Sequence, residues 1–463
     1  MRKPVASAIV IACFLSYSLA PRAGSVASAH LRLGASSATA NRDGQHWIGT
    51  WATAPQPAIP GKIQTFRNQT LRLIVHTSAG GTKVRIKISN TFADQPLVIG
   101  GAHIARRMAG ADIDPTSDRT LTFRGHTSTR IAARSMVVSD PSELDAPALS
   151  DLAVSLFLPD ITMAKTSHIL ALQTSYVSQE TGDSTATVNF PVAKTIVSWP
   201  FLTGVDVAAS PRGGTIIAFG SSLTDGDGST KDGNRRWPDV LAERLQKEGG
   251  PKESMGVLNE GMIGNRLLSD FDSPRQAGGP FGAVFEQLGP ALGPSGLARF
   301  DRDVIAQAGV KYVILALGVN DILFPGSFIS ITESVRAQSL ISGNRQLIAR
   351  AHKKGIRVIG STIPPFENAI FREPLITLYT SEKEMVRQTV NAWIRSSTEF
   401  DAVIDFDAVL RDPNRPAQLL PSYDSGDHLH VNNAGNIAQG NAIPLALFHR
   451  RLANGRPARI EGA

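Results

Sequence analysis

Four short polar segments of this chain carry residues that could act together in nucleophilic catalysis. In chain order the segments read FGSSLTDG around Ser222, NEGMIGN around Gly264, GVND around Asn320, and DSGDHLH around Asp427 and His430. A serine hydroxyl attacks a carbonyl carbon when a histidine takes its proton, and a carboxylate behind the histidine fixes the tautomer of the ring. An amide side chain or a backbone N–H can stabilise the oxygen charge that develops. Because Asp427 lies three residues before His430, its carboxylate can fold back to the ring, and the set predicts nucleophilic acyl transfer.

Each segment by itself also has a purely structural explanation. Serine and glycine are common in strand-to-helix loops, and the GxSxG elbow of other serine hydrolases is not found in the sequence. Gly264 could mark an ordinary turn, whereas Asn320 could form an Asx turn that closes a strand. The segment that ends at His430 could be a solvated acidic loop. The hydrolase interpretation therefore depends on the four segments jointly.

Two groups of side chains could instead bind a metal ion. The segment DGDGS opens like a calcium loop, but an EF-hand would need glycine at Thr230 and glutamate at Arg236. His428 and His430 with Asp427 are metal-binding residue types, but no clear further ligand accompanies them. We therefore expect neither a metal nor an organic cofactor.

The elements that must position these residues alternate between short apolar runs and helical stretches. Strands are expected in the apolar runs, at residues 215–219, 257–258, 312–317, 356–359 and 402–406. Helices are expected over 237–247 and 381–397, where Ser381 and Glu384 have the spacing of a capping box. Strands that alternate with helices predict a parallel sheet covered on both faces, with its chemistry at the carboxyl ends of the strands. Three of the polar segments directly follow such runs, and a serine at the sheet edge could expose its hydroxyl.

The residues before this region have a different pattern. Apolar residues occupy every second position within 71–75, 84–88 and 152–158, and Gly, Pro, Asn and Asp separate such runs. No long helical pattern interrupts them. We expect an N-terminal β-sandwich domain over 46–208, followed by the α/β hydrolase domain over 212–455.

The first 29 residues are expected to be a secretory signal peptide. Arg2 and Lys3 precede an apolar run over 5–19, and a small-residue cleavage site ends at Ala29. The run is short for a transmembrane helix, so we expect a secreted or periplasmic protein without stable membrane insertion. Cys13 is the single cysteine, so cleavage would leave no thiol for disulfides or nucleophilic catalysis.

The next segment and the overall charge exclude some other functions. Residues 30–45 are small and polar, and are expected to be a flexible leader. The formal net charge is +7, but no basic run carries interleaved aromatic residues. Nucleic acid is therefore not an expected partner.

Together, the four polar segments resemble the signature blocks of the SGNH, or GDSL, hydrolase family. The resemblance covers about residues 213–448 and implies a flavodoxin-like parallel sheet. It implies a catalytic triad and an oxyanion hole, the triad made of Ser222, His430 and Asp427, and the hole made of Ser222, Gly264 and Asn320.

One position departs from the family pattern. The first block of the family usually reads Gly-Asp-Ser-Leu, and Ser221 replaces the aspartate here. That aspartate is not the family's proton carrier, so activity is expected to survive. Ser222 is preferred to Ser221 as the nucleophile because Leu223 and Thr224 follow it, as they follow the family serine.

The N-terminal region resembles a β-domain that precedes the hydrolase domain in some bacterial members. The segments that carry this resemblance are WIGTWA from Trp47, QTLR from Gln69, and Ser89-Asn90. Members of this subgroup include acetylxylan-esterase-like proteins, which implies a small-molecule or polysaccharide ester as substrate.

Three functions are compatible with these patterns. The first is an esterase that removes O-acetyl or other short acyl groups from carbohydrate. The second is a lipid or aryl esterase, although no long amphipathic lid segment supports a true lipase. The third is a carbohydrate-binding protein with a decayed hydrolase site, against which the complete set of triad and oxyanion residues argues. The sequence leaves the oligomeric state and the role of the β-domain open.

Overall fold

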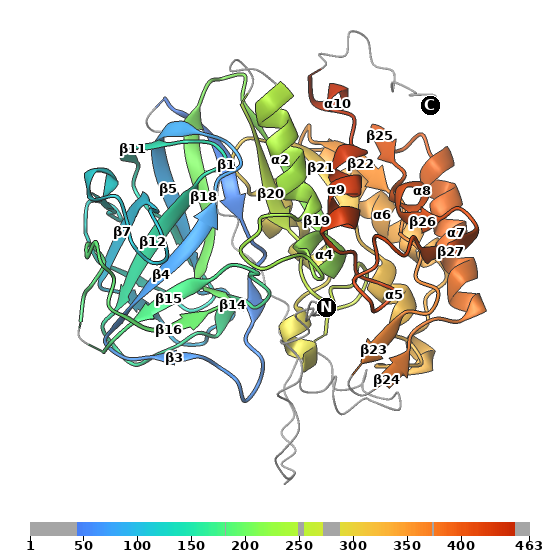
Figure 1. Ribbon diagram of the computed structural model, residues 1–463, viewed down its shortest axis with the longest axis horizontal. Coiled ribbons are helices and arrows are strands. Elements are labelled where there is room, and N and C mark those ends of the chain that lie inside the picture. The colour runs from blue at the N-terminus through green and yellow to red at the C-terminus, as the bar shows by residue number, and fades with distance from the viewer. Residues whose placement is uncertain (1–43, 181, 249–253, 272–287, 373–374, 450–463) are drawn as a thin grey trace, which may run out of the picture.

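The structure, a computed structural model, describes residues 44–180, 182–248, 254–271, 288–372 and 375–449. They form a strand-rich N-terminal region and a mixed helix-and-strand C-terminal region that lie side by side (Figure 1). The expected signal peptide and all but the end of the expected leader lie outside the described residues, as does the end of the expected hydrolase domain after residue 449. Within these ranges, no helix has the length and apolar character needed to cross a bilayer.

The N-terminal region is built from two main antiparallel sheets. The first has the order β1-β18-β5-β10, with β11 also paired to β5, and the second has the order β16-β15-β4-β12-β7-β8. The strands of the first sheet are β1 His46–Ala52, β5 Gly81–Ser89, β10 Met136–Val138, β11 Ser142–Ala146 and β18 Leu202–Ala209. Those of the second are β4 Gln69–His76, β7 Gly101–Arg106, β8 Arg119–Thr120, β12 Asp151–Leu158, β15 Ser175–Ser178 and β16 Val192–Ile196. The strands expected near 71–75, 84–88 and 152–158 are therefore present as β4, β5 and β12.

One apolar core lies between these strands. Alternating residues on β5, such as Val84, Ile86 and Ile88, belong to the same buried cluster as Leu71 and Leu73 on β4. Because side chains on a strand alternate between its two faces, the period of two in the sequence places one face of each sheet in this core.

The C-terminal region contains a parallel sheet with the strand order β20-β19-β21-β22-β25. Its strands are β19 Gly214–Gly220, β20 Met255–Glu260, β21 Val310–Ala316, β22 Arg357–Ser361 and β25 Ala402–Ile404. In chain order this is 2-1-3-4-5, the order of a flavodoxin-like doubly wound sheet. All five strands were expected from the apolar runs, although β25 ends two residues early because Asp405 caps the short helix α8 (Phe406–Leu410).

Helices cover both faces of this sheet, as the sequence predicted. On β19, Ile216 and Ala218 pack in a cluster with Trp237 of α2, whereas Ile217 and Phe219 pack in a cluster with residues of the opposite layer. The helices on the first face include α2 Trp237–Glu248 and α8, and those on the second include α4 Gly296–Phe300, α6 Ala337–His352 and α7 Ser381–Ser396. Because both faces are buried, the strands read as continuous apolar runs.

Two local expectations were wrong or incomplete. The N-cap of α7 is Thr380, whose side chain accepts from the Lys383 N–H, so Ser381 is already helical and forms no capping box. Glu384 instead pairs with Arg387, at 2.6 Å. The sequence also did not predict two hairpins that precede the last polar segment, β23–β24 (Ile370–Arg372 and Leu375–Thr377) and β26–β27 (Arg411–Asp412 and Arg415–Leu419).

Direct hydrogen bonds join the two regions. The Gly49 N–H of β1 donates to Thr215 Oγ1 of β19, at 3.0 Å. Lys87 Nζ donates to Gln307 Oε1, at 2.8 Å. Most of the atoms involved are withdrawn from water, so the regions hold each other in a defined orientation.

Candidate active site

Ser222 lies at the carboxyl end of the central strand β19. It is the first residue of the short helix α1 (Ser222–Asp225), and Ser221 is the N-cap. Gly220 allows this tight strand-to-helix turn, because a Cβ there would lie 2.0 Å from Thr224 Oγ1. The expectation of an exposed hydroxyl was wrong: Ser222 is only 4% exposed, and the side chain of His430 lies against it.

The structure brings Asp427, His430 and Ser222 into one line of hydrogen bonds. His430 Nε2 lies 2.9 Å from Ser222 Oγ, and His430 Nδ1 lies 2.6 Å from Asp427 Oδ2. The other carboxylate oxygen of Asp427 accepts from the N–H groups of Leu429 and His430, at 3.0 and 2.8 Å. These bonds orient the carboxylate, which in turn places a hydrogen on Nδ1 and leaves Nε2 to accept the serine proton.

Gly264 and Asn320 lie in the loops that follow the two strands beside β19. Gly264 has φ +67°, and an added Cβ would lie 2.6 Å from the Leu292 side chain, so only glycine fits without strain. Asn320 is in α5 (Val319–Leu323), directly after β21. Its Nδ2 donates to the Asn265 carbonyl at 2.9 Å, which uses one of its two hydrogens and orients the amide.

Two buried residues without a predicted role connect these loops. Asp321 accepts from the Leu267 and Leu268 N–H groups, at 2.7 and 3.0 Å. Burial raises the pKa of Asp321 to about 6, although these N–H groups oppose the shift. Arg299 Nη2 donates to the Gly220 carbonyl, and its Nε donates to Asn265 Oδ1, at 2.8 and 2.9 Å.

These two residues differ in the signal that the sequence contained. Asp321 directly follows Asn320 inside a noted motif, so its position could have suggested a role. Arg299 lies in a helix with no motif around it. From sequence alone, an arginine is expected at the surface. Arg299, however, is 1% exposed and pairs with Asp303 at 3.0 Å.

A second carboxylate faces the candidate base. Asp227 Oδ2 lies 3.7 Å from His430 Nε2, on the same side of the ring as Ser222. Burial lowers the pKa of His430, but the charges of Asp427 and Asp227 outweigh it and raise this pKa to about 9. Burial would raise the pKa of Asp427, but the charge and hydrogen bonds of His430 hold it far below its usual value. Burial, with the nearby carboxylates of Asp427 and Asp225, raises the pKa of Asp227.

This electrostatic arrangement predicts an alkaline pH profile. His430 must be neutral to accept a proton, so kcat/KM should rise with pH through the pKa of about 9. Asp227→Asn removes one of the charges that raise this pKa, and should therefore move the limb to lower pH. The profile is measured between pH 5 and 10 with a short aryl ester. An unchanged limb, or one moved to higher pH, would contradict the assignment of Asp227.

The free energy of unfolding should fall as the pH rises, whereas kcat/KM should increase. The pKa of His430 is raised above its ordinary value of 6.5, so the protonated ring stabilises the folded state. This contribution is complete below pH 6.5 and is lost as the pH rises through about 9. The thermal midpoint of the wild type, compared with that of His430→Gln across the same range, checks the sign.

The carboxylates of the possible calcium loop do not converge. Asp225 accepts from the Ile263 N–H at 3.0 Å and lies 3.0 Å from His168 Nε2, whereas Asp227 faces His430. Within the described ranges, no group of three or more His, Cys, Asp or Glu residues could hold a metal ion.

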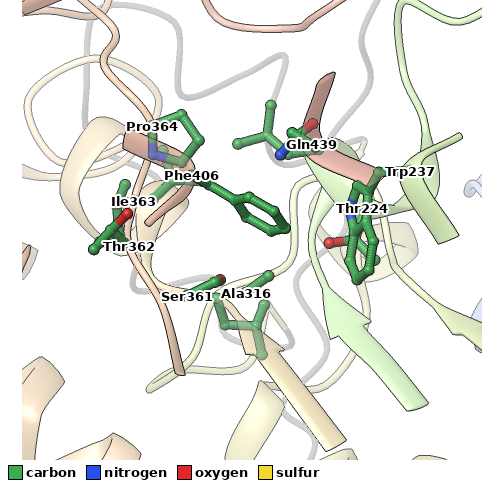
Figure 2. Close-up of a pocket in the computed structure, with 12 residues that line it drawn as sticks. Thr224, Trp237, Ala316, Ser361, Thr362, Ile363, Pro364, Phe406 and Gln439 are labelled. Carbon is green, nitrogen blue, oxygen red and sulfur yellow. The ribbon is translucent and has the colours of Figure 1, made fainter. Parts of the chain in front are cut away.

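A cavity of about 20 Å³ lies next to α1 (Figure 2). Thr224, Trp237, Phe406 and Gln439 are among its lining residues, and Figure 2 shows them converging from α1, α2, α8 and α9 (Asn433–Asn441). None of the predicted triad or oxyanion residues lines it. The cavity therefore lies beside α1 and does not include the residues of the candidate active site.

The comparisons with known proteins agree with this arrangement. Residues 216–443, slightly less than half of the chain, match the model of the family described as GDSL-like lipase/acylhydrolase. The parallel sheet, the site and this match together define an ester-hydrolysing enzyme. Its C-terminal region is similar to the GDSL-like lipase/acylhydrolase family, also known as the SGNH hydrolases.

Several solved structures are similar to part of this chain. A putative arylesterase from Agrobacterium tumefaciens is 21% identical, with 50% of this chain and 95% of that chain covered and a TM-score of 0.34. An aryl esterase from M. smegmatis is 20% identical, with 50% and 95% covered and a TM-score of 0.36. An acetyl xylan esterase from Geobacillus stearothermophilus is 18% identical, with 53% and 99% covered and a TM-score of 0.34. No curated protein matches this chain.

Proposed function

We propose that this enzyme is a serine esterase that removes acetyl or other short acyl groups from carbohydrate hydroxyls. The observation that carries the proposal is the unbroken hydrogen-bonded line from Asp427 through His430 to Ser222. The loops that bear Gly264 and Asn320 are the expected sources of the oxyanion donors. This constellation can perform acyl transfer without a metal.

The proposed reaction passes through an acyl-enzyme. Ser222 Oγ attacks the ester carbonyl carbon while His430 Nε2 takes its proton. The oxygen charge is stabilised by the N–H groups of Ser222 and Gly264 and by the amide of Asn320. The bond from the carbonyl carbon to the alcohol oxygen then breaks, and His430 returns the proton to that oxygen. A water molecule, activated by the same base, releases the acid and restores Ser222.

The residues near His430 support a hydroxyl-rich alcohol. The Asp227 carboxylate is 33% exposed, and the His428 side chain is 46% exposed and pairs with Asp424 at 2.5 Å. A partly buried carboxylate that is still accessible to solvent, and an exposed imidazole, can exchange hydrogen bonds with sugar hydroxyls. Leu292 packs against Gly264, which limits the space beside that donor and supports a short acyl group.

A comparison of three substrates tests the proposal. Acetate release from acetylated xylan is measured beside hydrolysis of p-nitrophenyl acetate and p-nitrophenyl palmitate, with Ser222→Ala as the blank. We expect acetate release from xylan, and kcat/KM for the acetyl ester at least about tenfold above that for the palmitoyl ester.

The other outcomes would correct the proposal in defined ways. Preferred hydrolysis of the palmitoyl ester, or of the aryl acetate with no release from xylan, would instead assign a lipid or aryl esterase. No turnover above the Ser222→Ala blank, together with binding to xylan, would indicate a carbohydrate-binding protein with a decayed site.

We further propose that the N-terminal region is a β-sandwich domain of the subgroup that precedes SGNH hydrolase domains, and that the protein is exported. The shared core of the two antiparallel sheets supports the sandwich. N-terminal sequencing of protein from the growth medium or periplasm tests export, with cleavage after Ala29 as the expected result.

A further inference from the structure

The N-terminal region contributes a buried histidine next to the nucleophile helix. His168 is the last residue of β14 (Thr166–His168) and is 1% exposed. Its Nδ1 lies 2.9 Å from the Ala54 carbonyl oxygen, within the same region. Its Nε2 lies 3.0 Å from Asp225 Oδ1, in the hydrolase region. The two side chains therefore form a buried contact between the regions.

Asp225 connects this contact to the candidate oxyanion hole. It is the last residue of α1, which begins at Ser222, and its Oδ2 accepts from the Ile263 N–H at 3.0 Å. Ile263 directly precedes Gly264. The Asp225 carboxylate, which is 3% exposed, thus joins three parts of the molecule. These are α1, which carries the candidate nucleophile, the loop around Gly264 (the oxyanion loop), and the N-terminal region.

A second contact from the N-terminal region reaches a segment that packs against the same loop. Gln56, which is fully buried, donates from Nε2 to the Ala291 carbonyl at 2.8 Å. Its Oε1 accepts from the Ile169 N–H at 3.1 Å, so it is tied to the residue after His168. The neighbouring Leu292 packs on Gly264. The N-terminal region therefore contacts the surroundings of Gly264 at two linked points, Asp225 and Ala291.

We propose that His168 is a positioning residue for the reaction and acts through Asp225 on the oxyanion loop. A buried carboxylate that loses one of its two hydrogen-bond partners is under-solvated and tends to move toward other polar groups or water. Such a movement would shift the Ile263 N–H, and with it the backbone of Gly264. Oxyanion donors must lie at hydrogen-bond distance from the charge that develops, and a displacement of about 1 Å can cost about 10²-fold in rate.

This inference rests on the proposed function, and a double-mutant cycle tests it. His168→Phe should lower kcat by about 10- to 100-fold while KM changes less than about threefold, because the loss falls on the transition state. If His168 acts through Asp225, the double variant with Asp225→Ala should be no slower than Asp225→Ala alone. Inactivation by an organophosphonate, whose phosphoryl oxygen occupies the oxyanion hole, should slow in parallel with kcat.

Conservative variants and a matched control separate positioning from folding. His168→Gln keeps an amide N–H near the place of Nε2, and His168→Asn keeps one near the place of Nδ1. The glutamine variant should retain more activity than the asparagine variant, and this comparison stands if His168→Phe does not fold. His76→Phe removes the ring of another His–Asp pair in the same region, with Asp151 at 2.7 Å, and should leave kcat within about twofold.

Several results would overturn the proposal. One is that His168→Phe has the same kcat per titrated active site as the wild type and differs only in a lower melting temperature. Another is a multiplication of the two single effects in the double variant, and a third is equal activity of the glutamine and asparagine variants. The proposed function fails differently, because in that case the wild type would show no activity that depends on Ser222.

Discussion

Replacing Ser222 with alanine should lower kcat for a short aryl ester by about 10⁵-fold, with a residual rate from the oxyanion hole alone. The substitution removes the one hydroxyl that lies 2.9 Å from His430 Nε2. Without it the acyl-enzyme cannot form. The fold should be retained, because the backbone of Ser222 still begins α1 and the side chain fills little volume. Steady-state kinetics measure the loss, and circular dichroism checks the fold.

The adjacent serine offers a matched control for this substitution. Ser221 is fully buried, and its Oγ has no hydrogen-bond partner among the described residues. Its capping role uses its backbone carbonyl, which accepts from the Thr224 and Asp225 N–H groups at 3.0 and 2.9 Å. Ser221→Ala should therefore keep kcat within about threefold. Mass spectrometry after phosphonate labelling should find the adduct on Ser222, and an adduct on Ser221 would reverse the assignment.

Replacing Asp427 with asparagine should lower kcat by about 10⁴-fold at neutral pH, with little change in KM. Asparagine can present an amide N–H to His430 Nδ1, which then favours the tautomer with its hydrogen on Nε2. That tautomer cannot accept the proton of Ser222. The variant also loses the largest favourable charge on the protonated ring, so the transition state is less stabilised. Kinetics from pH 6 to 10 measure the effect.

The same loop contains a control of nearly identical chemistry. Asp424 lies three residues before Asp427 in the chain. Its carboxylate lies 2.5 Å from His428 Nδ1 and accepts from the Gly426 N–H at 2.7 Å. Asp424→Asn should cost less than about tenfold, because that pair does not contact the nucleophile and the charge of Asp424 acts on His430 more weakly than that of Asp427. Equal losses in the two variants would show that loop structure, rather than the charge behind His430, causes the effect.

Local patterns in the sequence were sufficient for the elements that carry the site. The apolar runs predicted all five parallel strands, because a strand buried on both faces must be apolar throughout. The polar segments after these runs were expected at the carboxyl edge of the sheet, and the structure places Ser222, Gly264 and Asn320 there. The helix cap at Thr380 was missed because Ser381 has equivalent chemistry, and only the backbone angles distinguish the two positions.

The hydrogen-bond partners of buried polar side chains could not be predicted from local sequence patterns. Arg299 bonds to Gly220, which is 79 positions away in the chain, and His168 bonds to Asp225 across 57 positions. No local pattern marks such pairs, because an arginine or histidine is equally compatible with a solvated surface. The burial of Ser222 has the same origin, since the covering His430 comes from 208 positions away.

The sequence by itself determined which segments form buried strands, where the four polar segments lie, and which residue types are available for acyl transfer. These features depend on periodicity and on side-chain chemistry. Only the tertiary structure decided that Asp227 faces His430, that Arg299 joins two of the loops, and that His168 of the N-terminal region holds Asp225. The physical reason is that most buried polar groups are hydrogen-bonded, and packing rather than chain position selects the partner.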